Sequence, residues 1–203
     1  MQLSAEGISF RYQQRSMLFK EINFSIKQGE FVGLTGPSGC GKSTFCRILA
    51  GYESPTEGAI RLNGLPIKRN GYYPIQLVFQ HPEKAVNPRW KIEKTLNEGW
   101  KVDKEILELL GIEKGWLTRW PNELSGGELQ RICIARALSP RTQFLIADEM
   151  TTMLDAITQA QIWQAVRTVA KNRRMGIIVV SHEEHLVERL CERVVRLDEV
   201  GIK

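Results

Sequence analysis

The sequence lacks the features that would place it within a membrane or outside the cell. No apolar run approaches the ~20 residues that a helix needs to cross a bilayer. The N-terminus, from Met1 to Glu6, does not have the basic and then apolar order of a signal peptide. The four cysteines include no CxxC pair and no framework spacing. These absences favour a cytoplasmic protein with reduced thiols.

Dense basic runs with interleaved aromatic residues are also missing. The formal net charge is +5, which would suit nucleic acid, an anionic membrane face or nucleotide. The most basic stretch, residues 171–174, is short and reads as a solvated helix end. Charge alone therefore does not decide the partner. At 203 residues, with 42% hydrophobic content, the chain is long enough to bury a core.

Residues 36–43 fit the phosphate-binding pattern G-x-x-x-x-G-K-[ST]. In order they are Gly36, Pro37, Ser38, Gly39, Cys40, Gly41, Lys42 and Ser43. The glycines let successive N–H groups turn toward an anion, Lys42 adds positive charge for the β- and γ-phosphates, and the Ser43 hydroxyl suits Mg²⁺. A predicted strand at 30–35 and a predicted helix from Thr44 to Ala50 flank the loop, so a helix N-terminus adds to the anion site. This context disfavours the alternative of an ordinary glycine-rich turn.

The N-terminal part predicts antiparallel strands. Apolar residues alternate over 3–12 and 18–27, on either side of a polar loop at residues 13–16. Asn63-Gly64, after a short strand at 59–62, predicts a hairpin. Tyr12 ends the first strand, where an aromatic ring either stacks on a purine base or is a plain strand-edge residue. Its spacing from the phosphate loop does not decide between the two.

Residues 81–123 differ in character from the rest of the chain. They follow a predicted strand at 75–79 that ends at Gln80, and they begin with two prolines, Pro82 and Pro88. Helical periodicity then appears at 91–97 and 103–110. Four tryptophans lie in this part, Trp90, Trp100, Trp116 and Trp120. We interpret it as an inserted helical lobe in which the tryptophans are mostly packing residues.

A second helix N-terminus is predicted at residues 124–128, which read LSGGE. Ser125 and Glu128 form an S-x-x-E capping box, and the helix runs to about Leu138. Capping of the helix is by itself enough to explain why Ser125 and Glu128 occur at these positions. Gly126 and Gly127 nevertheless permit close approach, so the same helix N-terminus remains available to another anion.

Residues 144–149 are four apolar residues followed by two acids. A buried parallel strand has this pattern, and ligands bind at the carboxyl ends of such strands. Asp148 is a candidate to hold, directly or through water, the Mg²⁺ that Ser43 ligates, and Glu149 is a candidate to orient the attacking water. Two solvated carboxylates are the alternative. A chain that already needs a magnesium ligand favours the metal site.

The last part of the chain predicts a helix, a strand that ends in Ser181-His182, and a final strand at 193–197. The helix spans Asp155 to Ala170 and carries Ile162, Val166 and Val169 on one face. His182 and His185 are three residues apart, whereas the zinc-protease helix needs a spacing of four with Glu between. We therefore expect no zinc site, and His182 is a candidate contact for a γ-phosphate.

In this order the motifs resemble the ATP-binding cassette (ABC) family, the nucleotide-binding subunits of ABC transporters. The resemblance rests on Tyr12, the loop at 36–43, Gln80, LSGGE at 124–128, Asp148 with Glu149, Asp155 and His182. It implies an α/β fold of the P-loop NTPase class, with a mixed sheet core, an N-terminal antiparallel β subdomain and an inserted helical lobe. It also implies one domain over 1–203, in which 1–80 and 141–203 form the RecA-like core with the β subdomain, and 81–140 form the helical subdomain with the signature motif.

The resemblance implies an ATPase that uses ATP and Mg²⁺, and that dimerises head to tail around two ATP molecules. Ser125 and Gly127 of one subunit would close on the γ-phosphate held by Lys42 of the other, with Asp155 at the seam. Thr44 would join the phosphate loop. Gln80 and His182 would sense the γ-phosphate, Gln80 would complete the magnesium ligands Ser43 and Asp148, and Glu149 would be the general base.

The implied partners are a second ABC ATPase, membrane permease subunits and, indirectly, a solute-binding protein, with no nucleic acid. The implied location is the cytoplasmic face of the cell membrane, with peripheral attachment. A finer resemblance, at 78–82, 86–89 and 158–162, is to peptide and nickel importer ATPases, which usually pair two different subunits. The stretch between Gln80 and Ser125 and the tail after His182 are shorter than in that subfamily. The cargo and the choice between homodimer and heterodimer therefore stay open.

Two departures from the family pattern lie beside the candidate base. Met150 stands where proline is usual, and Met153 stands where a small residue is common. We expect Met150 to loosen the turn beside Glu149, with a modest effect on rate.

Two competing functions remain. One is a soluble ABC ATPase that acts on ribosomes or DNA, a class that generally needs two cassettes or large insertions. The other is a regulatory partner that does not hydrolyse ATP. Intact Lys42, Asp148, Glu149 and His182 disfavour the latter.

Overall fold

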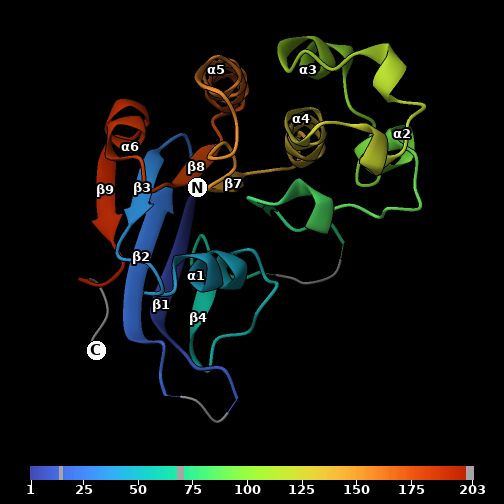
Figure 1. Cartoon of the computed structure of the whole chain (residues 1–203). Helices are drawn as coiled ribbons and strands as arrows, with labels where there is room; N and C mark the ends of the chain where they lie inside the picture. The colour runs from blue at the N-terminus through green and yellow to red at the C-terminus, as the bar shows by residue number, and fades with distance from the viewer. Residues whose placement is uncertain (14–15, 68–70, 200–203) are drawn as a thin grey trace.

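The core of the protein is a five-stranded parallel sheet, seen in a computed structural model that describes residues 1–13, 16–67 and 71–199 (Figure 1). The strands are β3 (Phe31–Thr35), β6 (Ile75–Val78), β7 (Phe144–Asp148), β8 (Gly176–Val180) and β9 (Arg193–Arg196), in the order β6-β7-β8-β3-β9. Each pairing within this sheet is parallel. The carboxyl ends of four neighbouring strands therefore meet at one edge, where the chain continues into Gly36, Gln80, Glu149 and Ser181.

A second sheet is antiparallel and contains β1 (Gln2–Phe10), β2 (Phe19–Lys27), β4 (Glu57–Leu62) and β5 (Leu65–Pro66), in the order β2-β1-β4-β5. It confirms the predicted N-terminal strands, although β1 ends before Tyr12. The predicted polar loop includes Gln14 and Arg15, which lie outside the described residues. Asn63 and Gly64 have φ angles of 53° and 76°, the positive values that a two-residue hairpin turn requires.

Six α-helices connect these strands in the described part of the chain. They are α1 (Lys42–Leu49), α2 (Ile92–Leu96), α3 (Lys104–Leu109), α4 (Gly126–Ala137), α5 (Ala156–Arg173) and α6 (Glu184–Leu190). α5 continues three residues beyond its predicted end at Ala170, and Arg174 ends it with a φ of 52°. α6 was not predicted, because it is short and follows directly on the His182 turn. Among the described residues, no helix is long and apolar enough to cross a bilayer.

Short 3₁₀ helices complete the helical lobe at η1 (Pro82–Lys84), η2 (Lys114–Trp116) and η3 (Pro121–Glu123). The tryptophans of this lobe behave differently from one another. Trp116 is buried, and the indole N–H of Trp100 donates to the carbonyl oxygen of Arg136 at 2.9 Å. Trp120 is 40% exposed, and Trp90 lies under the ammonium of Lys94 at 4.2 Å from its ring centre. The interpretation of the tryptophans as mostly packing residues therefore holds for Trp116 and Trp100, and Trp120 is the exposed exception.

Two apolar clusters cover the two faces of the parallel sheet. Along β7, Leu145 and Ala147 belong to one cluster, while Phe144 and Ile146 belong to the other. The first cluster joins the sheet to α5, α4 and the rest of the helical lobe. The second joins it to α1 and the antiparallel sheet, which lie together on the opposite side in Figure 1. This alternation explains the continuous burial of β7 and β8, as expected for parallel strands.

Gly33 shows how tightly these layers pack, because α6 lies directly on β3 at this residue. A Cβ atom at Gly33 would overlap Cγ1 of the buried Val187. We expect Gly33→Ala to lower the free energy of unfolding by about 1–3 kcal/mol through overpacking. Urea titration measures the change. Gly115→Ala is the control, because a Cβ there meets nothing within 4 Å; equal losses in the two variants would contradict the packing argument.

Candidate functional site

The phosphate loop connects β3 to α1 and curls around the side chain of Lys42. Gly36, Gly39 and Gly41 have φ angles of 142°, 80° and 102°, which other residues rarely adopt. The Lys42 ammonium donates to the carbonyl oxygens of Gly36 at 2.8 Å and Pro37 at 3.1 Å. Lys42 is only 7% exposed. The loop therefore closes over a positive charge, as the sequence pattern predicts.

The N-terminus of α1 adds to this positive field. Its N-cap is Gly41, which has no side chain to bond the first N–H groups, and its first turn contains no acidic residue. Because the positive end of the helix dipole and these N–H groups point toward the loop, they favour an anion bound within the loop. The loop and the helix thus form one candidate anion-binding site.

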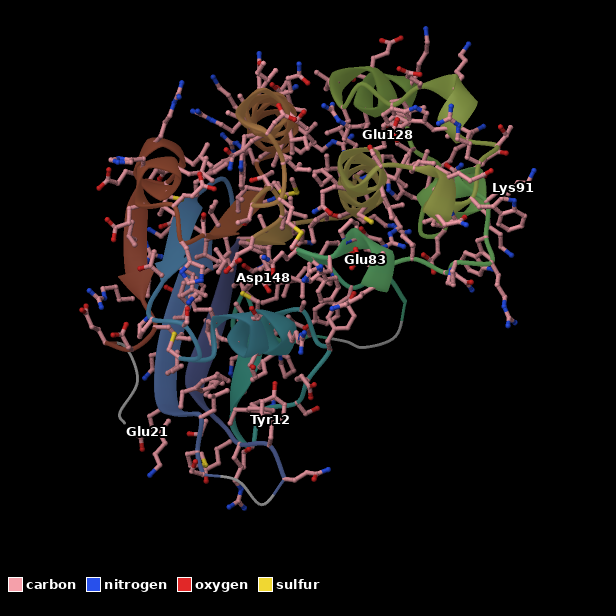
Figure 2. The ribbon with its side chains drawn as sticks, viewed as in Figure 1. Tyr12, Glu21, Glu83, Lys91, Glu128 and Asp148 are labelled. Atoms are coloured by element: carbon pink, nitrogen blue, oxygen red, sulfur yellow. The ribbon has the colours of Figure 1, made fainter. Side chains whose placement is uncertain are left out.

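Ser43 and Asp148 bring two hard oxygen atoms together beside this site. The Ser43 hydroxyl donates to Oδ1 of Asp148 at 3.3 Å, across the gap between α1 and the end of β7. Figure 2 shows Asp148 between the parallel sheet and α1. Burial raises the pKa of Asp148, and its hydrogen bond with Ser43 opposes the rise. A hydroxyl and a partly desolvated carboxylate are the ligands that Mg²⁺ prefers, so these residues fit that ion.

Glu149 lies between two side chains from neighbouring strands. The side-chain amide of Gln80, after β6, donates to Oε2 of Glu149 at 3.0 Å. Nε2 of His182, after β8, is 3.0 Å from Oε1 of the same carboxylate. Glu149 itself has a φ of 50°, a left-handed conformation that is rare and strained outside glycine. The three predicted catalytic side chains therefore meet at the edge where the phosphate loop begins.

The turn after Glu149 is anchored to the core and to α5. Met150 is 3% exposed and packs in the apolar cluster on the α5 face. The hydroxyl oxygen of the buried Thr151 accepts from the indole N–H of Trp163 at 3.1 Å and from the amide of Gln159 at 3.2 Å. Packing and hydrogen bonds to one helix thus hold the strained backbone of Glu149 in place.

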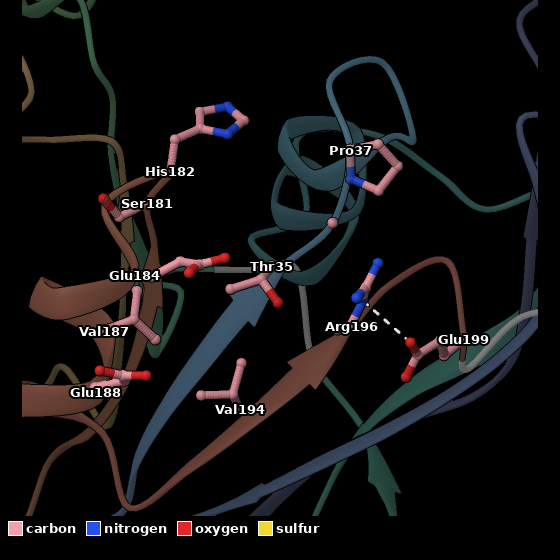
Figure 3. A pocket seen from close by; sticks show the side chains of 11 residues that line it. Thr35, Pro37, Ser181, His182, Glu184, Val187, Glu188, Val194, Arg196 and Glu199 are labelled. Carbon is pink, nitrogen blue, oxygen red and sulfur yellow. Dashed lines mark ion pairs between the residues drawn. The ribbon is translucent and has the colours of Figure 1, made fainter.

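His182 also faces a groove on the other side of the phosphate loop (Figure 3). The groove has a volume of about 610 Å³ and lies between the carboxyl end of β3, α6 and β9. Figure 3 shows His182 and Pro37 at the same end of the groove and the Arg196–Glu199 ion pair along one wall. His185 is fully exposed and lies 3.9 Å from Glu188, so the two histidines face different carboxylates.

Tyr12 reaches the phosphate loop from beyond β1. Its hydroxyl lies 2.9 Å from the hydroxyl of Thr44 in the first turn of α1. Its ring packs edge-on against Phe10, with ring centres 4.8 Å apart, and Tyr12 remains 37% exposed. The structure therefore places an accessible aromatic ring beside the anion site.

Ser125, Gly127 and Asp155 lie away from this assembly, at the N-termini of two adjacent helices. Ser125 caps α4 in the predicted capping box: its hydroxyl accepts from the N–H of Glu128 at 3.3 Å, and the Glu128 carboxylate accepts from the N–H of Ser125 at 2.7 Å. A Cβ at Gly127 would lie 3.4 Å from Leu154. Figure 2 shows Glu128 well apart from Asp148.

Asp155 caps the neighbouring helix α5. Its Oδ1 accepts from the N–H groups of Ile157 at 3.1 Å and Thr158 at 3.0 Å. These bonds, Thr158 first, lower the pKa of Asp155. The N-termini of α4 and α5 thus form a second surface, separate from the phosphate loop within one chain.

Two groups of buried polar side chains near the site were not predicted. One is Thr151 with its partners on α5. The other is Gln130 of α4, which donates to the carbonyl oxygen of Phe79 at 3.1 Å. Single buried polar residues of this kind have no sequence pattern, because their partners are distant in the chain.

Replacing Asp148 by Asn should stabilise the nucleotide-free chain at neutral pH. Because burial raises the pKa of Asp148, its contribution to stability is fully present below the usual carboxyl pKa and is lost as the pH rises through the raised value. Asn removes the free-energy cost of burying an ionised carboxylate, and its side-chain oxygen still accepts the hydrogen bond from the Ser43 hydroxyl. We expect the Tm without Mg²⁺ to rise by about 2–4 °C, which corresponds to about 1 kcal/mol in a chain of this size.

The gain in Asp148→Asn should shrink as the pH falls to the usual carboxyl range, where both side chains are neutral. Asp155→Asn is the matched control and should not raise the Tm, because hydrogen bonds favour the ionised form of Asp155. Thermal scans at several pH values measure both variants. A lower Tm for Asp148→Asn at neutral pH would contradict the argument.

Comparison with known proteins identifies the family to which this site belongs. Residues 19–152 match the family described as ABC transporter. The nickel import ATP-binding protein NikE of Escherichia coli O6:K15:H31 is 35% identical over 211 residues, which cover 95% of this chain and 78% of the relative.

Solved structures agree with that match. A dimeric structure of the ATP-binding cassette MJ0796 in a post-hydrolysis state, bound to ADP and Pi, has a TM-score of 0.79 at 28% identity and covers 96% of this chain and 93% of that one. The cbiO1 protein of Clostridium perfringens, part of the ABC transporter complex cbiONQ, has a TM-score of 0.78 at 25% identity, with 96% and 83% covered. The chain therefore belongs to the ABC transporter family, as an ATP-binding cassette that hydrolyses ATP with Mg²⁺.

Proposed function

We propose that this cassette powers the import of a small solute, of the metal or peptide class, through membrane permease subunits. The observation that carries the proposal is the 35% identity, over 95% of the chain, to a protein named for nickel import. The cassette attaches peripherally at the cytoplasmic face of the membrane, and a solute-binding protein acts on it only indirectly. A second ABC ATPase subunit completes the assembly, and no nucleic acid takes part.

In this proposal the phosphates of ATP bind to the loop formed by residues 36–43 and to Thr44. The positive φ angles of the loop glycines, the buried ammonium of Lys42 and the uncapped N-terminus of α1 support that role. Tyr12 stacks on the base, a role supported by its exposed ring beside Thr44. Asp148, Ser43 and Gln80 hold Mg²⁺, which neutralises charge on the phosphates when it is bound.

Glu149 is the general base that orients the attacking water and accepts its proton. Two observations support this role: its carboxylate is only 17% exposed, and Gln80 and His182 each hold one of its two oxygens. Such fixed geometry favours proton transfer at a defined position. Gln80 and His182 are thereby placed to respond to the γ-phosphate, because either one can exchange its bond with Glu149 for a bond to that group.

A second cassette supplies the missing half of the site. Within one chain, Ser125 and Gly127 lie apart from Lys42, at a helix N-terminus that suits an anion. We infer that they close on the γ-phosphate of the partner and that Asp155, on the adjacent helix, lies at the seam. The dimeric cassette at 28% identity supports this arrangement.

The permease docks in a groove between α1 and the helical lobe. The groove has a volume of about 630 Å³, and Ser43 and Asp148 of the proposed metal site line it together with Arg47, Tyr52, Phe79, Gln80, Lys84 and Arg136. Tyr52 is 62% exposed there, which leaves an aromatic side chain for a partner to cover. Because Gln80 lines the groove and also bonds Glu149, an occupant of the groove is linked to the catalytic base.

We infer that the whole chain acts as one domain with two parts, which is the division that the resemblance implies. Residues 1–80 and 141–203 form the RecA-like core with the β subdomain, and 81–140 form the helical subdomain. The apolar cluster on the α5 face supports this division into parts of one domain, because it continues from the parallel sheet into α4, α2 and α3 without interruption.

Glu149→Gln tests the catalytic half of the proposal. The amide is the same size but cannot accept a proton at neutral pH, so we expect steady-state turnover to fall by about 100-fold or more. ATP binding should be retained, and the variant should accumulate as a dimer with ATP. Phosphate release and mass in solution, with and without ATP, measure these effects. Glu105→Gln, at an exposed position on α3, is the control and should keep wild-type turnover.

Uptake by cells that carry the chain with its permease tests the transport half. Cells with Glu149→Gln should lose uptake of one cargo, and labelled nickel and a labelled dipeptide distinguish the two classes. Retained uptake of both, together with co-purification of the chain with ribosomes or nucleic acid, would overturn the import proposal. A wild-type chain that binds ATP but neither hydrolyses it nor dimerises would instead require a different second cassette.

Met150→Pro tests the turn beside Glu149. Because Gln80, His182 and α5 hold this turn, we expect kcat to change by less than about tenfold, or 1.4 kcal/mol in the barrier. The Tm should fall, because the buried side chain of Met150 is lost. Met150→Leu, which keeps the packing, should match the wild type in both measurements. A tenfold or larger gain in turnover would show that Met150 limits the rate.

A further inference from the structure

One face of α4 binds the segment at residues 79–85 through three evenly spaced contacts. The amide of Gln130 donates to the carbonyl oxygen of Phe79 at 3.1 Å. The thiol of Cys133 lies 3.9 Å from the carbonyl oxygen of Pro82, and the guanidinium of Arg136 donates to that of Ala85 at 2.8 Å. Both partners advance by three residues, so this segment follows the helix for nearly two turns.

Gln130 is the contact of this series that lies nearest to the catalytic side chains. It is 2% exposed, and its side-chain oxygen has no hydrogen-bond partner among the described residues. A buried amide with one unpaired atom costs free energy that an apolar side chain of the same shape would avoid. What Gln130 offers here that an apolar side chain does not is therefore the hydrogen bond that it donates to the Phe79 carbonyl oxygen.

That bond fixes the peptide group directly before Gln80. Because the peptide unit is planar, holding the Phe79 carbonyl oxygen also sets the direction of the Gln80 N–H and of its Cα atom. The side chain of Gln80 in turn donates to Glu149 at 3.0 Å. Two hydrogen bonds thus connect α4, which begins with the Ser125 capping box, to the carboxylate of Glu149.

We propose that Gln130 is a positioning residue for Gln80, which it holds against Glu149 through the Phe79 carbonyl. A displacement of α4 moves this carbonyl and thereby changes the hydrogen bond between the Gln80 amide and the Glu149 carboxylate. The inference rests on the proposed roles of Glu149 and Gln80. It adds that the placement of the Ser125 helix controls the catalytic base through the buried amide of Gln130.

A double-mutant cycle between Gln130 and Gln80 tests the proposal. Gln130→Met keeps the size and apolar stem of the side chain but removes the donor. We expect kcat to fall by about fivefold or more while KM for ATP changes by less than about twofold, because the loop at 36–43 and the Lys42 ammonium, which hold the phosphates, keep their own contacts. In a Gln80→Ala background, the same change should lower kcat by less than about twofold, since Gln130 then has nothing to position.

Additive effects, with the same fold-loss in both backgrounds, would overturn the proposal, and so would an unchanged or raised kcat in Gln130→Met alone. Gln143→Met is the matched control. Gln143 also has an unpaired buried side-chain oxygen, but it precedes β7 at the end opposite to Asp148. Its replacement should leave kcat unchanged in both backgrounds.

A second variant and a second measurement keep the test decisive if Gln130→Met folds poorly. Arg136→Met removes the donor to Ala85 from the same helix face, together with the Arg136–Glu98 ion pair, and should show the same non-additivity with Gln80→Ala. Hydrogen–deuterium exchange without nucleotide needs no turnover. Exchange at residues 79–85 should rise in Gln130→Met while β7 stays protected, and equal protection of 79–85 in variant and wild type would overturn the proposal.

A wild-type chain that fails to hydrolyse ATP with its partners would contradict the proposed function. An active wild type with an additive cycle would contradict only the role of Gln130. The two failures are therefore distinguishable.

Discussion

The parallel pairing of β7 with its two neighbours is the constraint on which the site depends. β7 pairs with β6 on one side and β8 on the other, so that Gln80, Glu149 and His182 leave the sheet at the same edge. Side chains alternate between the two apolar clusters along β7, and a slip of one residue would exchange its faces. The hydrophobic order of the core therefore fixes the positions of the charged side chains.

The site contains a buried charged group and a strained backbone, both of which are unfavourable in the folded chain without nucleotide. Asp148 is buried and its pKa is raised, Lys42 is nearly buried, and Glu149 adopts a strained backbone conformation. The raised pKa of Asp148 and the strained backbone of Glu149 both cost the nucleotide-free chain stability. In the proposed function, phosphates and a divalent cation would bring charge complementary to Lys42 and Asp148, which is the usual exchange of stability for activity at a functional site.

The sequence predicted the parts of the site whose chemistry is local. The phosphate loop, the acidic end of β7 and the Ser125 capping box are contiguous motifs, and their backbone conformation follows from their own glycines and caps. The contacts of Gln130 with Phe79 and of Thr151 with Trp163 could not be predicted, because each joins residues that only tertiary packing brings together. The exposure of Trp120 was missed for the same reason, whereas α6 was missed because it is short and follows directly on the His182 turn.

The shared apolar cluster of the helical lobe also limits how this molecule can move. Ile92 of α2, Ile106 of α3 and Ile132 of α4 belong to the same cluster as Val166 of α5. A lobe joined to the core by flexible linkers alone would swing freely about a hinge. In this lobe, a displacement that kept the apolar surfaces in contact would instead be a shear over the α5 face, in small steps.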